Sequence, residues 1–136
     1  MRMLPSGLPD HVSDPECVSR FLTSSSQFNS TMVKPAAFLP HPVHRNSSVF
    51  RIGEDPEQLR KVWQETTSGE RQLKAVAIVN VSEVRRAQLD VVAEEPPPKH
   101  ANIEGWPWVE SDPELQKARQ KDLATQVASC AQLVVL

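Results

Sequence analysis

Apolar residues along the chain fall into several short runs that are separated by prolines and polar loops. The longest run, residues 73–81, is nearly continuous, which is typical of a strand covered on both faces of a sheet. Shorter apolar segments at residues 47–52 and 89–93 predict two further strands. The pattern therefore indicates a small sheet built from short strands.

Helix starts are marked by the tripeptide Asp-Pro-Glu, which occurs at residues 14–16, 55–57 and 112–114. A proline in the first turn beside an acidic residue is typical of helix N-termini. A serine before the first and the third tripeptide completes a capping box. The predicted helices cover residues 17–22, 54–67 and 112–131, with a further short turn at residues 83–88.

Three capped helices and four or five short strands in mixed order predict an α+β fold. We expect a small mixed sheet of four to five short strands with about three helices packed on one of its faces. Residues 47–81 contain a strand, a helix and a strong strand in sequence, which indicates a βαβ element. The length of 136 residues predicts one domain over residues 1–136, in which residues 1–12 form an extended arm.

Two connecting segments precede the strand at residues 47–52. Residues 23–31 are rich in hydroxyl side chains, which favour a loop because they compete for backbone hydrogen bonds. Residues 32–40 contain two prolines, so we expect an edge strand or an extended packing segment. The chain as a whole has 12 prolines against 4 glycines, which predicts stiff connectors.

Charge is distributed unevenly along the chain, although the net charge is only −2. Residues 17–53 contain no Asp or Glu, whereas they carry Arg20, Lys34, Arg45 and Arg51. If these residues share one face of the folded protein, that face would attract phosphate groups or an acidic partner. The near-neutral balance gives no support to broad nucleic-acid binding.

The candidate for chemistry is the segment at residues 99–108, which follows three consecutive prolines. It places His100, Asn102, Trp106 and Trp108 in what we expect to be a loop, and loops on a rigid scaffold often carry function. A purely structural alternative stays open. In that interpretation the two indoles cover an edge of the core, while His100 and Asn102 cap the loop.

Several other kinds of site lack their signatures. The sequence contains no G-x-S-x-G nucleophile motif, and its scattered glycines cannot form a phosphate-binding loop. His41 and His44 would supply only two ligands to a metal, without a carboxylate nearby, so we expect no metal and no cofactor. Cys17 and Cys130 have no metal-ligand spacing and are interpreted as small core residues on predicted helices in a reducing compartment, although a single bridge between them stays open.

The leading hypothesis is a module that binds a phosphate-bearing ligand, a nucleotide or an RNA end, with phosphoryl or ribosyl chemistry as the candidate reaction. Arginine forks and ammonium groups suit phosphate, an amide can read a base edge, an indole can stack on a base, and an imidazole can transfer a proton. The candidate ligand-binding residues are Arg20, Lys34, Ser48, Arg51, Asn102 and Trp106, and the candidate catalytic residue is His100.

The alternative hypothesis is a non-enzymatic adaptor or small subunit of a larger protein assembly. The apolar end of the chain, residues 133–136, is expected either to pack into the core or to contact a protein partner. No apolar stretch approaches the length of a signal peptide or a membrane span, so we expect a cytoplasmic protein without membrane contact.

Three short motifs resemble those of a family of small bacterial proteins with no known activity. They are VKPAAF at residues 33–38, SVFR at residues 48–51, and HANI followed by GWP within residues 100–107. The resemblance covers the chain from about Arg20 to the last helix. It implies a bacterial cytoplasmic setting, and it implies no reaction and no functional residue.

Overall fold

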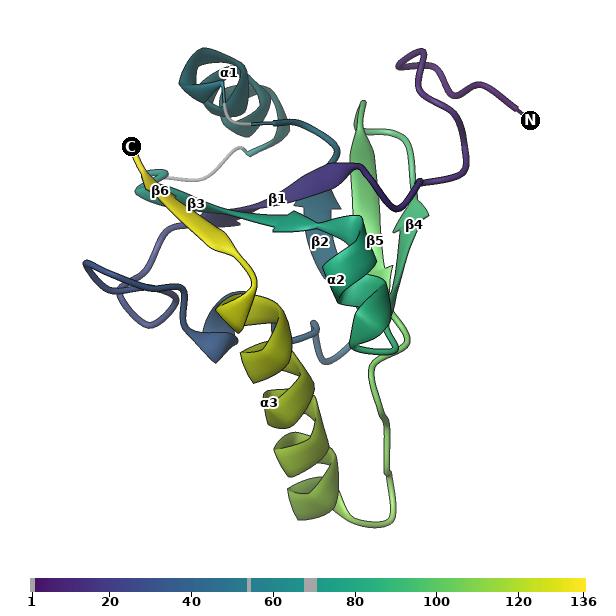
Figure 1. Ribbon diagram of the computed structural model, residues 1–136, viewed down its shortest axis with the longest axis vertical. Coiled ribbons are helices and arrows are strands. Elements are labelled where there is room, and N and C mark those ends of the chain that lie inside the picture. The colour runs from purple at the N-terminus through teal and green to yellow at the C-terminus, as the bar shows by residue number, and fades with distance from the viewer. Residues whose placement is uncertain (1, 54, 68–70) are drawn as a thin grey trace.

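The computed structural model describes residues 2–53, 55–67 and 71–136. Within these residues the chain forms a six-stranded sheet, three α-helices and one short 3-10 helix (Figure 1). The predicted α+β class is confirmed, with six strands in place of the four or five expected. The elements are β1 (Cys17–Leu22), η1 (Pro35–Ala37), β2 (Ser47–Phe50), α1 (Pro56–Thr66), β3 (Ala75–Asn80), α2 (Val81–Arg86), β4 (Asp90–Ala93), β5 (His100–Glu104), α3 (Pro113–Ser129) and β6 (Gln132–Val135).

The strands lie in the order β4-β5-β2-β1-β3-β6, and every neighbouring pair is antiparallel. Because β1 lies between β2 and β3 and is antiparallel to both, β2 and β3 run parallel to each other. The expected strand–helix–strand unit over residues 47–81 is therefore present, with β1 inserted between its two strands. The strongly apolar β3 is buried along five of its six residues, as its sequence predicts.

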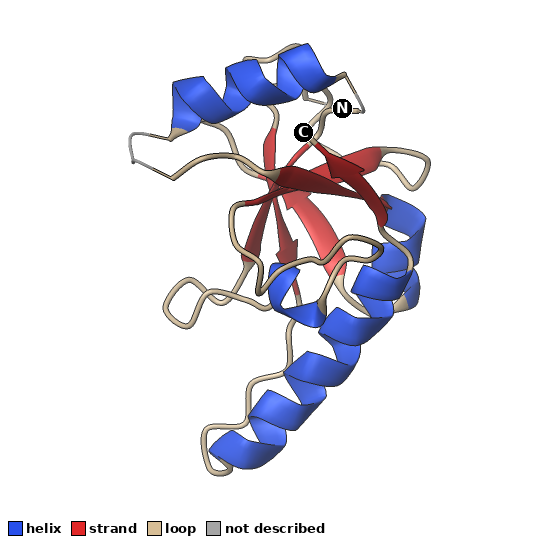
Figure 2. Cartoon of the chain, turned by 90° about the vertical axis from the view of Figure 1, so that its left-hand side faces the viewer, coloured by secondary structure: helices blue, strands red, loops and turns tan. Residues whose placement is uncertain are grey.

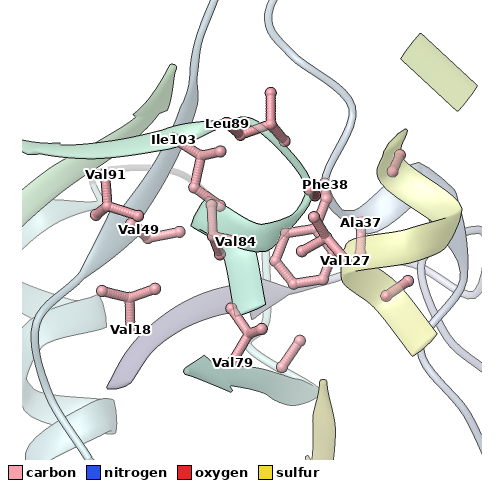
Figure 3. Packing of buried hydrophobic residues seen from close by; sticks show 14 of the residues in the cluster. Val18, Ala37, Phe38, Val49, Val79, Val84, Leu89, Val91, Ile103 and Val127 are labelled. Carbon is pink, nitrogen blue, oxygen red and sulfur yellow. The ribbon is translucent and has the colours of Figure 1, made fainter. Parts of the chain in front are cut away.

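Helices cover both faces of the sheet, which corrects the expectation that they share one face (Figure 2). On one face Val49 of β2 belongs to the same core cluster as Val84 of α2 and Val127 of α3 (Figure 3). On the other face Leu59 of α1 belongs to a second cluster with Val76 of β3. The apolar side of α1 thus covers the face of the sheet opposite to α2 and α3.

The segment expected to be a helix at residues 17–22 is instead strand β1. One half of the capping box forms, because the Ser13 backbone N–H donates to Glu16 Oε2 at 2.7 Å. The Ser13 hydroxyl donates to the same Oε2 at 3.1 Å, and the Glu16 N–H donates to the Ser13 carbonyl oxygen at 3.1 Å, as in a turn. The turn ends there, and residues 17–22 pair with β3 over six consecutive positions. Since Val18 and Leu22 are buried in the main core, pairing in the sheet outweighs the local helix signal.

The candidate loop at residues 99–108 is also partly a strand. β5 lies between β2 and β4, with Ala101 and Ile103 in the main core and His100 and Asn102 on the opposite side. Gly105 ends the strand with a φ of 91°, a left-handed conformation that favours glycine. The two polar residues of this motif are therefore held by a rigid ladder.

The expectations for residues 32–40 and for the two cysteines are also revised. Residues 32–40 form neither an edge strand nor an extended segment, because η1 places Ala37 and Phe38 in the core, both fully buried. Cys17 lies at the start of β1 and Cys130 follows α3, and both thiols are free and exposed. The apolar end of the chain is edge strand β6, which pairs with β3.

Candidate functional site

A hollow of about 380 Å³ opens on the sheet where β1 and β2 diverge. We call it the β1–β2 pocket. Its lining comes from β1, β2, the first residue of β5, the end of α1 and the connectors beside them. The charged and catalytically capable side chains in this lining are Arg20, Ser48, Arg71 and His100.

The divergence of β1 from β2 leaves carbonyl groups that side chains satisfy. The register between these strands contains the pair Ser19–Phe50. On one side of this pair the Ser19 hydroxyl donates to the Ile52 carbonyl oxygen at 2.8 Å. On the other side Arg20 Nη1 donates to the Ser48 carbonyl oxygen, also at 2.8 Å. Two side chains therefore replace the missing ladder, and one of them is a cation.

The Arg20 guanidinium is held firmly at the edge of the pocket. Its Nε donates to the Ala37 carbonyl oxygen at 2.9 Å, in addition to the bond to Ser48. Burial lowers the pKa of Arg20, but a guanidinium stays protonated in proteins. Among the described residues no carboxylate forms an ion pair with Arg20. Its positive charge is thus compensated only by carbonyl dipoles and is available to an anion.

Ser48 and His100 form a hydrogen-bonded pair in the pocket. Ser48 Oγ lies 2.7 Å from His100 Nε2, and His100 Nδ1 lies 2.8 Å from the Glu94 carbonyl oxygen. A carbonyl oxygen can only accept, so Nδ1 of the neutral ring carries the hydrogen. Nε2 then has a free lone pair, and the Ser48 hydroxyl donates to it. The backbone of Glu94 therefore sets the tautomer in which His100 can accept the serine proton.

Aromatic rings form the wall behind this pair. The Phe50 and His100 ring centroids are 5.3 Å apart in an edge-to-face arrangement, and Phe21 lies 5.2 Å from Phe50. Trp63 of α1 meets Phe21 edge-on at 5.7 Å. Edge-to-face contacts of this kind hold the rings in place, and Trp63 also lines the pocket. The wall is suited to the flat face of a ligand.

The lining of the pocket is positively charged, although the chain as a whole has a net negative charge. Arg20 and Arg71 both line it, whereas its described lining contains no Asp or Glu. The remaining polar lining is neutral and comes from the hydroxyls and amide of Thr23, Gln27, Thr66 and Thr67. Guanidinium and hydroxyl donors without a competing carboxylate are the groups that bind phosphate oxygens.

Three of the seven candidate residues from the sequence, Arg20, Ser48 and His100, meet in the β1–β2 pocket. Arg51 does not, because its side chain is only 1% exposed and forms an ion pair with Glu16 at 2.8 Å. It also donates to the carbonyl oxygen of Pro9 at 2.7 Å. Arg51 therefore fastens the N-terminal arm to the sheet.

The other three candidates lie elsewhere. Lys34 donates to the Ser25 carbonyl oxygen and lines a separate apolar hollow beside α3. Asn102 lies opposite Ser48 in the ladder, but it is 2% exposed and its Nδ2 has no hydrogen-bond partner. The Trp106 indole is buried in the main core, where its Nε1 donates to the Ile103 carbonyl oxygen at 3.1 Å.

Sequence reasoning missed Arg71, which follows α1 and carries no motif. It also missed the Glu94 carbonyl group, since a backbone acceptor has no signature in a sequence. Phe21 lies within residues 17–22, the segment expected to be a helix, and strand β1 places it on the pocket wall. The sequence does contain one signal for the pocket, the absence of acidic residues from 17 to 53.

No family model matches this chain, and neither a curated protein nor a solved structure matches it. Over residues 2–53, 55–67 and 71–136, no group of three or more His, Cys, Asp or Glu residues is placed to hold a metal ion. Nor does any helix in this described part of the chain have the length and apolarity that are needed to cross a membrane.

Proposed function

We propose that this protein binds a phosphate-bearing ligand, a nucleotide or an RNA end, in the β1–β2 pocket. The observation that carries the proposal is the half-buried Arg20 guanidinium, which forms no ion pair within the described residues and lines the same pocket as the Ser48–His100 pair. The ligand's phosphate contacts Arg20 and Arg71, and its base packs on the aromatic wall. The residues proposed for binding are therefore Arg20, Ser48, Arg71 and Trp63, and the residue proposed for proton transfer is His100.

Charge and shape both support a small anion as the ligand. A volume of about 380 Å³ is at the lower end of the range for small-molecule sites. Arg20 is already held by two carbonyl oxygens, so little side-chain entropy is lost when it contacts a phosphate. A neutral ligand would leave the charge of Arg20 uncompensated in a half-buried position, which is unfavourable.

The test is calorimetric titration with ATP, and with adenosine as the matched ligand without phosphate, at low and moderate salt. We expect ATP to bind at low salt and to weaken steeply as salt is added, because the contacts are ionic. Adenosine should bind much more weakly than ATP. Absence of ATP binding at low salt would contradict the proposal.

Three variants with the same loss of charge locate the binding site. Arg71→Gln should weaken ATP binding by about 1.4 kcal/mol, roughly tenfold, because Arg71 lines the pocket. Arg60→Gln should leave binding unchanged, since Arg60 is exposed on α1 and is not part of the pocket lining. Lys34→Gln should also have no effect, because Lys34 lines a different hollow.

A second candidate function is supported by the edge of the sheet at β6. This strand contains no charged residue, and Val135 is 62% exposed. Edge strands that lack charge and proline can accept a further strand from another chain. We infer that an adaptor role would use β6 to add a strand of a partner protein. Sedimentation over a range of concentrations tests this role, because the role requires that the chain associates through β6. The Val135→Lys variant should abolish this association.

A further inference from the structure

We propose that Ser48 is a nucleophile that His100 activates, and that its substrate is a phosphoric anhydride such as the terminal phosphate of a nucleoside triphosphate. This inference rests on the proposed function, because it uses the same pocket and the same anion. It adds a covalent step and a substrate class to the binding site.

The geometry needed to activate a serine is present. A general base must lie within hydrogen-bond reach of the hydroxyl, and a third group must orient the base. The 2.7 Å contact between Ser48 Oγ and His100 Nε2 meets the first condition. The 2.8 Å contact between His100 Nδ1 and the Glu94 carbonyl oxygen meets the second. Glu94 Oε1 lies 3.9 Å from the same Nδ1, so a carboxylate also faces the ring when it becomes protonated.

Both residues are placed by the sheet and not by a flexible loop. His100 is opposite Phe50, and Ser48 is opposite Asn102, so the two reacting residues are diagonal neighbours across β2 and β5. A diagonal pair is within reach when one side chain is an imidazole. His100 is 8% exposed, and the Phe50 ring packs against it edge-on. The ring is therefore held in the orientation that presents Nε2 to Ser48.

The charges in the pocket match a phosphoryl group. Arg20 Nη1 donates to the main-chain carbonyl oxygen of Ser48, and Arg20 and Ser48 both line the pocket. Arg71 adds a second guanidinium to the same lining. Cations close to the reacting centre stabilise the charge on the equatorial oxygens in the transition state of phosphoryl transfer.

The substrate class follows from how the leaving group must depart. In phosphoryl transfer the leaving oxygen lies roughly opposite the attacking oxygen, away from Ser48 and His100. Among the described lining residues His100 is the only side chain suited to act as a general acid or base, since the two arginines stay protonated. No second acid is then placed to protonate an alkoxide. A phosphate leaving group needs no proton, because it is stable as an anion, and this favours an anhydride over an alkyl ester.

The reaction balances in two steps. In the first, Ser48 Oγ forms a bond to the terminal phosphorus, the bond from phosphorus to the bridging oxygen breaks, and the leaving phosphate keeps that electron pair. His100 Nε2 takes the hydroxyl proton. In the second step a water oxygen attacks the phosphorus, the bond to Ser48 Oγ breaks, and the His100 imidazolium returns its proton to Ser48. The two hydrogens of the water stay on the phosphate, which leaves as dihydrogen phosphate. The products are inorganic phosphate and the shortened nucleotide.

The test is incubation with ATP in buffer containing magnesium ions, followed by an acid quench and peptide mass spectrometry. We expect one phosphoryl group on Ser48, release of inorganic phosphate, and no reaction with glycerol phosphate, an alkyl monoester. Ser48→Ala should remove both the phosphoserine and the phosphate release. His100→Gln should slow phosphorylation of Ser48 at least tenfold. Ser47→Ala is the matched control, because Ser47 donates to Phe38 on the opposite face and should stay active.

The outcomes separate this inference from the binding proposal. If ATP binds but Ser48 is never phosphorylated, or if Ser48→Ala still releases phosphate, the nucleophile assignment is wrong and the binding site stands. If ATP does not bind, the proposed function fails as well. Turnover of glycerol phosphate as fast as ATP would overturn the substrate class. Circular dichroism of Ser48→Ala and His100→Gln checks that each variant is folded. If either variant is unfolded, Ser48→Thr is tested in its place, because it retains a hydroxyl at position 48.

Discussion

His100 Nε2 lies 2.7 Å from Ser48 Oγ, although the two residues are 52 positions apart in the sequence. The contact exists because β5 pairs with β2 in a register that makes these residues diagonal neighbours. A one-residue slip of β5 against β2 would turn the His100 side chain to the face opposite to Ser48. The strand pairing is therefore what creates the candidate site.

His100 should contribute to stability as well as to chemistry. His100→Ala removes hydrogen bonds to Ser48 and to the Glu94 carbonyl oxygen, and it removes the ring that packs on Phe50. We expect a loss of about 2 kcal/mol in the free energy of unfolding, measured by urea denaturation. Ser48→Ala removes only the first of these bonds and should cost about half as much. Equal stability of His100→Ala and the wild type would show that the ring is not held as the structure has it.

Arg20 should be needed for its forked shape and not only for its charge. Arg20→Lys keeps the charge but cannot bond the carbonyl oxygens of Ala37 and Ser48 in the same geometry. We expect the variant to lose about 2 kcal/mol of unfolding free energy in urea denaturation. Arg71→Lys, at the open side of the pocket, is the matched substitution and should be nearly neutral. Equal stability losses in the two variants would contradict the distinction between them.

The N-terminal arm should detach from the sheet in acid. Burial would raise the pKa of Glu16, but hydrogen bonds from Arg51 and Ser13 and the charge of Arg51 outweigh this and lower it. Burial is likewise outweighed at Glu95, where hydrogen bonds from Ser6 and Lys99 lower the pKa. A lowered carboxyl pKa gives stability that is complete above the ordinary value of about 4.3 and is lost as pH falls through the folded-state value.

We therefore expect the melting temperature to fall as the pH is lowered below about 4.3. Proteolysis of residues 2–12 should become faster over the same range. Glu16→Gln weakens the partner of the buried Arg51 and should cost about 2 kcal/mol at neutral pH, less than the loss from a fully buried pair. The acid-induced drop should also be smaller in this variant than in the wild type. A drop of unchanged size would show that Glu16 does not carry the effect.

Asn102 should be replaceable without loss of stability. Its Nδ2 is buried and has no hydrogen-bond partner, which is unfavourable for a polar group. Asn102→Val keeps a strand-forming side chain and removes this group, so the free energy of unfolding should rise by about 1 kcal/mol. Thermal denaturation and nucleotide titration of the same variant give both readouts, and affinity should not change. A clear loss of stability would mean that Nδ2 is hydrogen-bonded in solution.

The sequence predicted the helices where an Asp-Pro-Glu start is followed by a long segment. α1 and α3 both begin at the proline of an Asp-Pro-Glu tripeptide, and both are longer than ten residues. The same tripeptide before β1 failed as a helix signal. Half of its capping box formed, but only six residues follow before the next loop, and they gain more by pairing with β3. A helix-capping motif therefore does not determine whether the short apolar segment after it forms a helix or pairs in a sheet.

The candidate site could be predicted only in part. Residues 17–53 contain no acidic residue, and this signal placed Arg20 and Ser48 among the candidates that meet His100. Arg51 came from the same segment but pairs with Glu16, which lies one residue outside it. The contribution of Arg71 depends on how the chain returns from α1 to β3, which is a property of the fold and not of a motif.

The central claim is that an anion binds in the β1–β2 pocket, and nuclear magnetic resonance with inorganic pyrophosphate as the probe tests it most directly. Backbone and imidazole signals of the labelled full chain should be recorded as the probe is added at low salt. We predict the largest shifts at Arg20, Ser48, Thr66 and His100, which line the pocket. Shifts confined to Lys34, Lys117 and Lys121, which line the hollow beside α3, would contradict the claim.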